Sequence, residues 1–396
     1  MTIRHKLYRI IICLMVLCGF IWPGSTLSDI EFFAPSEIEY QTPDLTVSFF
    51  SYDNMETVPT TGATYTPVKP NEFDIAKKPD EKNFNMEANE DTPRVLKDIL
   101  SKYYEGTEVV QQEKAFKRVI SWKEDFEKIA DKYPNVNWQM LSAIVKAETQ
   151  GKTGRQESRA KAVGISQIRY QGAWAFLWDI LFRYEIKSGS GYVKDYYNAN
   201  LRVRYHSQLQ QIRQYLEEQR ILVKPTSRSE KAYRDARSAS WTNLKAHLRK
   251  KYKPGEYQVA VDIAAMYIDH LIITFQRVKH QVMEIKEYVG DNQFDGASAQ
   301  NFSGVIRIRW NSIKSKLLYH KGKPNFHEIT LARLNHILNS LEDPSIYSAA
   351  YNFGISKCLN YLEAGMKLPE SILRYVKKVL SYHDIFNEID IHKIYA

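Results

Sequence analysis

The chain has 396 residues, 44% of them hydrophobic, so it is long enough to bury one large core or two ordinary ones. This composition excludes a wholly disordered chain, and the formal net charge of +9 excludes an acidic protein. A basic surface favours polyanionic partners: nucleic acid, anionic lipid or an anionic cell wall.

The first 28 residues have the three-part layout of a secretory signal peptide. Arg4, Lys6 and Arg9 precede an apolar run from Ile10 to Trp22, and small or turn residues follow as far as Ser28. The run has about 13 residues, whereas a membrane-spanning helix takes about 20, so cleavage is expected rather than anchoring. No later stretch is expected to be apolar for long enough to span a bilayer. The sequence predicts export to the periplasm or cell envelope, with at most peripheral membrane association.

Residues 29–93 read as an extended, acidic and largely disordered arm. This segment holds fourteen acidic against four basic residues and seven prolines, without a helical apolar period. Residues 94–396 therefore carry a net charge of about +16. The export signal favours the cell wall as the anionic partner of this basic part.

After Pro93 the apolar spacing is helical almost throughout, and it predicts a mainly α fold. Asn137 and the residues just before it supply a helix start ahead of Trp138. Strand-like alternation is scarce, and its best candidate is Gly304 to Trp310. The segments with a helical apolar face are 95–100, 116–129, 138–148, 259–273, 331–341 and 372–380.

Residues 94–396 are expected to form one helical domain with insertions. The expected core covers about 115–180, 256–285 and 330–390, and the insertions cover about 190–256 and 290–327, which are rich in Arg, Lys, Tyr and polar residues. The insertions are interpreted as solvated helices and loops. The first is also a candidate docking site for an envelope or secretion machine.

Glu148 is a carboxyl on the apolar face of the helix that begins at Trp138. It follows apolar residues at positions 141, 144 and 145 by seven, four and three places, so it projects from the buried stripe. Burial of an unpaired carboxylate raises its pKa until the group holds a proton near neutral pH, as a general acid requires. The alternative is a paired or partly exposed glutamate at a frayed helix end.

A polar loop and a glycine motif follow this helix. Ser158 lies in the loop, Gly164 permits close approach of the backbone to a ligand, and Gln167 offers amide groups suited to a sugar. The stretch resembles the goose-type or soluble lytic transglycosylase family, whose hallmark is Glu-Ser, a short loop and then Ser-x-x-Gly-Ala-x-Gly-Leu-Met-Gln. Glu148 matches the catalytic glutamate. Thr149 takes the place of the serine and keeps a hydroxyl able to orient the carboxyl.

Three further segments resemble motifs of this family in the same order. Val261 to Leu271 resembles its Asn-Ile-x-x-Gly-x-x-Tyr-Leu-x-x-Leu helix, and Ala349 to Gly354 matches its Ala-Ala-Tyr-Asn-x-Gly motif, which lines the saccharide groove. Pro369 to Val379 matches the closing Pro-Glu-Thr-x-x-Tyr-Val-x-x-Val helix. The residues that the resemblance places at the saccharide are Tyr267, Tyr351, Asn352 and Tyr375.

The departures from the family pattern indicate a divergent member. Lys161 stands where glycine is usual, Ser166 replaces a methionine, and Asp262 replaces an asparagine. Tyr267 and Tyr375 also have a plainer interpretation, as core aromatics whose hydroxyls are satisfied.

The resemblance implies a lysozyme-like helical domain that cleaves the bond between N-acetylmuramic acid and N-acetylglucosamine. It implies that Glu148 protonates the leaving oxygen and then, as a carboxylate, removes the proton of the muramoyl C6 hydroxyl, which attacks C1. The product is a 1,6-anhydro end, and no metal or cofactor is needed. Most glycoside hydrolases use two carboxyls. The nearest others, Glu157 and Asp179, are interpreted as solvated charges.

The expected partners are therefore the glycan strands of peptidoglycan. A hydrolytic muramidase stays open as an alternative, as does a non-catalytic wall-binding or assembly protein, which the intact Glu148, Gln167 and Asn352 disfavour. The signal peptide disfavours a nucleic-acid binder, although the basic stretch Lys245 to Lys253 is compatible with phosphate contacts. The histidines show no spacing typical of metal ligands.

Overall fold

The computed structural model describes residues 92–158, 161–182, 200–227, 229–291, 304–317 and 325–391. The chain divides into two compact units, Met1–Asp44 and Leu45–Ala396, and the described residues all lie in the second. The expected signal peptide lies outside the described residues. So does the expected arm, apart from its last two positions, which belong to the first described helix.

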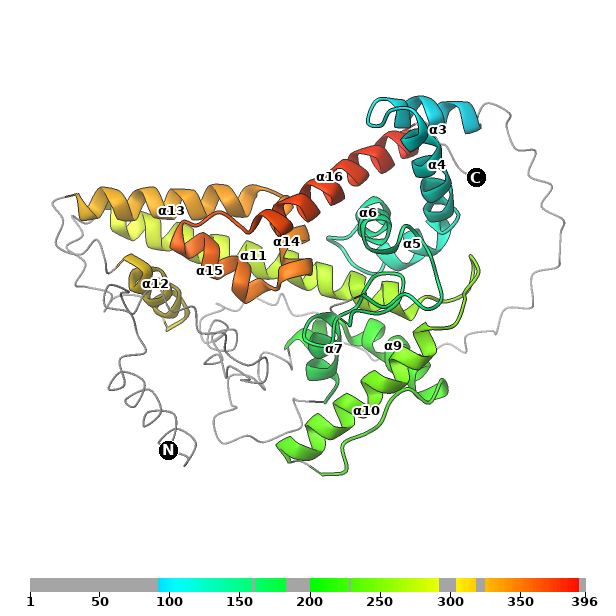
Figure 1. The fold of residues 1–396 in the computed structure, drawn as a ribbon. Helices are drawn as coiled ribbons and strands as arrows, with labels where there is room; N and C mark the ends of the chain where they lie inside the picture. Colours follow the sequence, from blue (N-terminus) through cyan, green and yellow to red (C-terminus); the bar gives the residue numbers. More distant parts are fainter. Residues whose placement is uncertain are drawn as a thin grey trace, which may run out of the picture. The chain divides into compact units, whose positions relative to one another are not determined.

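The described part of the chain is mainly helical, as the apolar spacing predicted (Figure 1). Within it, the β-structure consists of isolated bridges from Val163 to Glu157 and to Ile168. The helices are α3 (Thr92–Ser101), α4 (Thr107–Ile120), α5 (Lys123–Ala130), α6 (Trp138–Thr149), α7 (Ala173–Phe182), α9 (His206–Glu218), α10 (Glu230–Leu248), α11 (Val259–Asp291), α12 (Gly304–Leu317), α13 (Phe326–Glu342), α14 (Ser345–Phe353), α15 (Ile355–Ala364) and α16 (Glu370–Ile391).

Helix α11 is the centre of the core and contacts α5, α7, α9, α12, α13 and α14 (Figure 1). By length and composition, its span Val259–Gly290 is long and apolar enough to cross a membrane, contrary to the expectation that no stretch after Ser28 would be. However, 94% of its most apolar window is buried inside the protein. The core helix of a globular domain meets the same criteria, so this observation alone does not indicate a membrane span.

Two fully buried aspartates on α11 fix the turn that precedes α6. Asp262 accepts hydrogen bonds from Lys132 Nζ at 2.7 Å and from the Tyr133 hydroxyl at 2.5 Å. Asp269 accepts two from Asn135, one from the backbone N–H at 3.2 Å and one from Nδ2 at 2.7 Å. A buried carboxylate is tolerated only when such partners satisfy it. The start of α6 is therefore tied to the central helix.

The structure corrects two details of the sequence prediction. The prediction of a strand from Gly304 to Trp310 is wrong, because these residues begin α12. Trp310, Ile313 and Leu317 are all fully buried, and their spacing of three and four places them on one helix face, which overrides the local alternation. The helical face over 116–129 is split between α4 and α5, because the chain turns at Ser121–Trp122.

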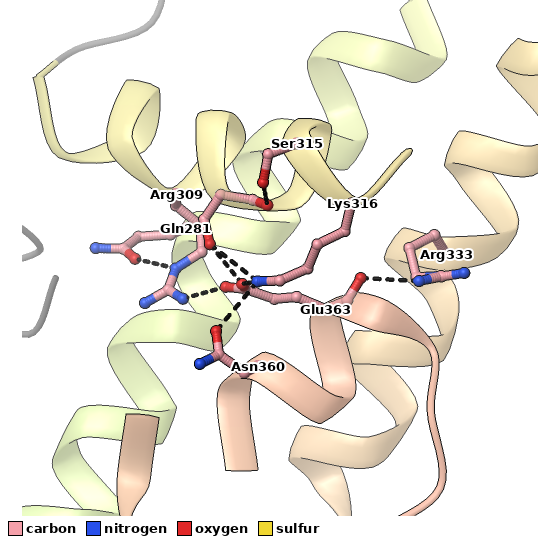
Figure 2. Close-up of polar contacts among 8 residues, drawn as sticks. Gln281, Arg309, Ser315, Lys316, Arg333, Asn360 and Glu363 are labelled. Atoms are coloured by element: carbon pink, nitrogen blue, oxygen red, sulfur yellow. Dashed lines mark hydrogen bonds and ion pairs between the residues drawn. The ribbon is translucent and has the colours of Figure 1, made fainter. Parts of the chain in front are cut away.

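A buried charge cluster fastens α12 to α11 and α15 (Figure 2). Glu363 of α15 accepts hydrogen bonds from Arg309 NH1 at 2.5 Å, from the Ser312 hydroxyl at 2.6 Å and from Lys316. Arg309 Nε also donates to Gln281 Oε1 at 3.2 Å. Arg309 and Glu363 are only 1% and 2% exposed. Part of the expected second insertion is therefore held in place by ionic contacts with the core.

Candidate active site

Helix α6 carries Glu148 one residue before its C-terminal end. The Asn137 side chain caps the other end by accepting a hydrogen bond from Met140 N at 2.8 Å, as expected for a helix start here. After Thr149 the chain enters the left-handed region at Gln150 (φ 57°), which terminates the helix. Glu148 is half-buried, so it is more exposed than its expected position on the buried stripe.

Tyr375 of α16 holds the Glu148 carboxyl. Its hydroxyl donates to Glu148 Oε1 at 2.7 Å, across 227 residues of sequence. Burial raises the pKa of Glu148 above the ordinary value, and this effect outweighs the opposing effects of the Tyr375 hydrogen bond and of the charges on Arg169 and Lys378. The carboxyl therefore holds its proton to a higher pH than an exposed glutamate does.

Arg169 is a site residue that the sequence analysis missed. It follows the glycine motif, and its guanidinium donates to the backbone carbonyl of Asn352 and, at 3.4 Å, to Asn352 Oδ1. Burial raises the pKa of Tyr351 and of Tyr375, and the charge on Arg169 acts against both rises as it does at Glu148. One cation therefore lies close to several of the predicted site residues. The available signal was an arginine two places after Gln167, where the family pattern gave no reason to expect a charge.

Lys378 is a second cation that the sequence analysis missed. It follows Tyr375 by three residues on α16, so the two side chains share one face of that helix. Lys378 Nζ donates to the Ala147 carbonyl at 2.9 Å, next to Glu148 in the chain. This bond satisfies a carbonyl near the C-terminal end of α6, where a cation is also favoured by the helix dipole.

Tyr351 and Tyr267 are buried beside one another. The Tyr351 hydroxyl donates to the Ser166 carbonyl at 2.7 Å, and the ring is 8% exposed. Tyr267 packs against Tyr351 with ring centroids 6.1 Å apart, and against Phe176 at 5.7 Å. Tyr351 thus joins α14 to the glycine motif, and Tyr267 has the core position that was its plainer interpretation.

The predicted residues of the glycine motif mainly shape the loop. Thr149 Oγ1 lies 2.8 Å from the Ile165 carbonyl oxygen and 3.2 Å from the Val145 carbonyl oxygen, both within hydrogen-bond distance. Its hydroxyl is therefore directed to the backbone. This corrects the expectation that it orients the Glu148 carboxyl. Gly164 has φ +78°, and an added Cβ there would come within 3.0 Å of a Leu248 side-chain atom. The close approach that glycine permits is therefore to the protein itself.

Ser158 and Gln167 complete the same loop. Ser158 Oγ accepts a hydrogen bond from Ala162 N at 3.1 Å. The Gln167 side-chain amide donates to the carbonyls of Gln156 at 3.2 Å and Gly164 at 3.0 Å. The amide donors expected to face a sugar are thus engaged inside the loop in this structure.

No protein-family model, curated protein or solved structure matches the chain. The site's chemistry must therefore be inferred from its own residues and from the motif resemblance.

The two other candidate carboxyls have structural partners. Glu157 forms an ion pair with Arg249 at 2.8 Å, and the hydrogen bond from this arginine lowers the Glu157 pKa. Asp179 accepts a hydrogen bond from the Tyr233 hydroxyl. The charged groups that act on Glu148 are both cations, Arg169 and Lys378.

Among the described residues, no three His, Cys, Asp or Glu side chains gather as a metal site would need.

Proposed function

We propose that this protein is a peptidoglycan lytic transglycosylase that uses Glu148 as its one acid and base. The observation that carries the proposal is a glutamic acid of raised pKa at the end of a helix, held by the Tyr375 hydroxyl at 2.7 Å. Tyr375 and Tyr351 are the tyrosines of two segments that resemble family motifs, and, after burial, the charge on Glu148 raises the pKa of both. We also propose that the helices form a lysozyme-like domain.

The reaction transfers one proton in each direction. Protonated Glu148 gives its proton to the glycosidic oxygen while the bond from C1 to that oxygen breaks. The muramoyl C6 oxygen then bonds to C1, and its proton passes to the Glu148 carboxylate. The enzyme ends in its starting form, and the products are a free hydroxyl and a 1,6-anhydro end.

The cations beside Glu148 fit this cycle. The acid must be neutral before it donates, and burial favours the neutral form. After donation it is a carboxylate, and Arg169 and Lys378 are placed to stabilise that charge. The same group therefore serves in both protonation states.

The remaining features of the proposal concern place and partners. We propose that the protein is exported to the periplasm or cell envelope and that its partner is the glycan strand. Docking of an envelope or secretion machine on the segment 190–256 remains part of this proposal. It would be contradicted if a variant lacking that segment kept both its localisation and its activity.

Product analysis tests the reaction type. Purified sacculi are digested with the wild-type protein, and the released muropeptides are analysed by mass spectrometry. An anhydro end is one water lighter than a reducing end, so the proposal predicts anhydro termini. Reducing termini would instead indicate the alternative function, a hydrolytic muramidase.

A further inference from the structure

Arg169 carries a charge that the described residues do not neutralise. Among them, its side chain forms hydrogen bonds with Asn352 alone, and no carboxylate lies within ion-pair distance of the guanidinium. The carboxyl whose titration it influences, Glu148, favours its neutral form because it is buried. A half-buried guanidinium without a paired anion can form a charge-assisted hydrogen bond with an anionic ligand.

The backbone holds Arg169 in a fixed place. The preceding residue, Ile168, pairs with Val163 through two hydrogen bonds of 2.9 and 3.0 Å. The Arg169 carbonyl accepts hydrogen bonds from Gly172 N at 3.2 Å and Trp174 N at 3.3 Å, where α7 begins. The guanidinium is therefore presented from a rigid turn, which lowers the entropy lost when a ligand binds.

The chemistry of the guanidinium indicates the kind of ligand. Arg has five N–H donors in a planar fork, which matches the two oxygens of a carboxylate. The contacts with Asn352 use the two terminal nitrogens of Arg169. The guanidinium keeps further N–H donors for a second, anionic partner.

We propose that Arg169 binds a carboxylate of the peptide substituent on the muramoyl residue, so that the site selects charged over neutral glycan. This inference rests on the proposed function. The muramoyl residue is the sugar whose C1 and C6 react, and it also bears the lactyl-peptide group. Arg169 is hydrogen-bonded to Asn352, a residue that the resemblance places at the saccharide, so its guanidinium lies beside the expected sugar site.

The test compares two substrates. Glycan strands with free peptide carboxylates are compared with the same strands after conversion of those carboxylates to methylamides, and kcat/KM is measured for each. A charge-assisted hydrogen bond contributes enough to predict that the wild type prefers the free carboxylates by about 10-fold or more. Arg169→Gln should lower kcat/KM on both substrates, because its charge also acts on Glu148, and the ratio between the two kcat/KM values should fall to within about 2-fold.

The controls separate recognition from folding and from net charge. Arg213→Gln removes an arginine of α9 whose partner is Glu217 at 3.2 Å, and it should keep the wild-type preference. Arg169→Lys keeps the charge without the fork and should keep part of the preference. If Arg169→Gln does not fold, the two substrates compared on the wild type and on Arg169→Lys still test whether Arg169 binds the carboxylate.

Two outcomes overturn the inference. One is equal cleavage of both substrates by the wild type, and the other is an unchanged preference in Arg169→Gln. A wild type that cleaves neither substrate would instead overturn the proposed function, on which the inference depends. Turnover without discrimination and absence of turnover are therefore distinguishable results.

Discussion

Glu148 differs from an ordinary surface glutamate in its burial and in its fixed hydrogen-bond donor. The Tyr375 bond lowers the pKa of Glu148 against the larger raising effect of burial. Tyr375→Phe should therefore raise that pKa further, because the carboxylate loses its donor. As pH rises through this pKa the acid loses its proton, so the basic limb of the kcat/KM profile should move to higher pH in the variant. The rate should fall by about 10-fold or more because the carboxyl is less well oriented.

A tyrosine that contacts α16 at a different place provides the control. Tyr103 donates to Glu388 of α16 at 2.8 Å, away from the site. Tyr103→Phe should leave the pH profile of cleavage unchanged. Identical profiles for the Tyr375→Phe variant and the wild type would mean that this hydroxyl does not act on the reacting carboxyl.

Lys146 is a fully buried lysine two residues before Glu148 on α6. Its Nζ lies 4.7 Å from the Phe116 ring centroid and 4.3 Å from that of Tyr382, and it donates to Gln112 Oε1 at 2.7 Å. Burial, with smaller effects from nearby cations, lowers the pKa of Lys146 to about 7. The folded protein therefore releases this proton at a lower pH than the unfolded chain does.

This difference predicts a pH-dependent stability. Between pH 7 and about 10.5 the unfolded chain binds the extra proton, so the free energy of unfolding should rise with pH. From pH 6.5 to 9.5 the wild type should gain ~2–3 kcal/mol relative to Lys146→Met. Urea unfolding at both pH values measures this gain, and parallel pH dependences for the two proteins would contradict it.

At the scale of elements, the N-terminal cap of α6 supports the helix that presents Glu148. Asn137→Ala removes the acceptor for Met140 N and should lower the free energy of unfolding by about 1 kcal/mol. Asn137→Asp restores an acceptor and should recover most of that loss. Chemical denaturation measures both, and an alanine variant as stable as the wild type would show that the cap is dispensable.

The cluster at Glu363 provides a second test at this scale. Glu363→Gln leaves Arg309 and Lys316 without their anion, and it should cost about 3–5 kcal/mol because Arg309 is buried (Figure 2). The control is Asp235→Asn, which breaks an exposed pair with Lys231 on α10 and should cost less than about 0.5 kcal/mol. Equal losses in the two variants would mean that burial does not govern the Glu363 cluster.

For the whole molecule, the sequence predicted helices well where one apolar face was regular. The helix from Trp138 and its start at Asn137 were confirmed, because local spacing and capping chemistry agree there. The strand prediction at Gly304 to Trp310 failed because Trp310, Ile313 and Leu317 are buried in a helix that packs on α11 and α15, which no local pattern records. The break at Trp122 was missed for the same reason, since that side chain turns into the core.

The candidate site was predictable only in part. Helix periodicity placed Glu148 on the buried stripe, and the structure shows it half-buried. The resemblance singled out Tyr375 as a saccharide residue but did not predict its hydrogen bond with Glu148. Arg169 and Lys378 were not predictable, because tertiary packing places them at Asn352 and at the Ala147 carbonyl, where their charges act on Glu148. Gln167 was expected to face a sugar, but the loop's own carbonyls use its donors, a detail that depends on the backbone path.

The most direct test of the central claim is muropeptide release from purified sacculi by the wild type and by Glu148→Gln. The amide nearly matches the carboxyl in size but cannot donate an acidic proton, so the variant should unfold at about the wild-type temperature yet release nothing above the blank. The wild type should release anhydro-ended fragments. Appreciable release by a folded Glu148→Gln variant would contradict the assignment of Glu148 as the acid and base.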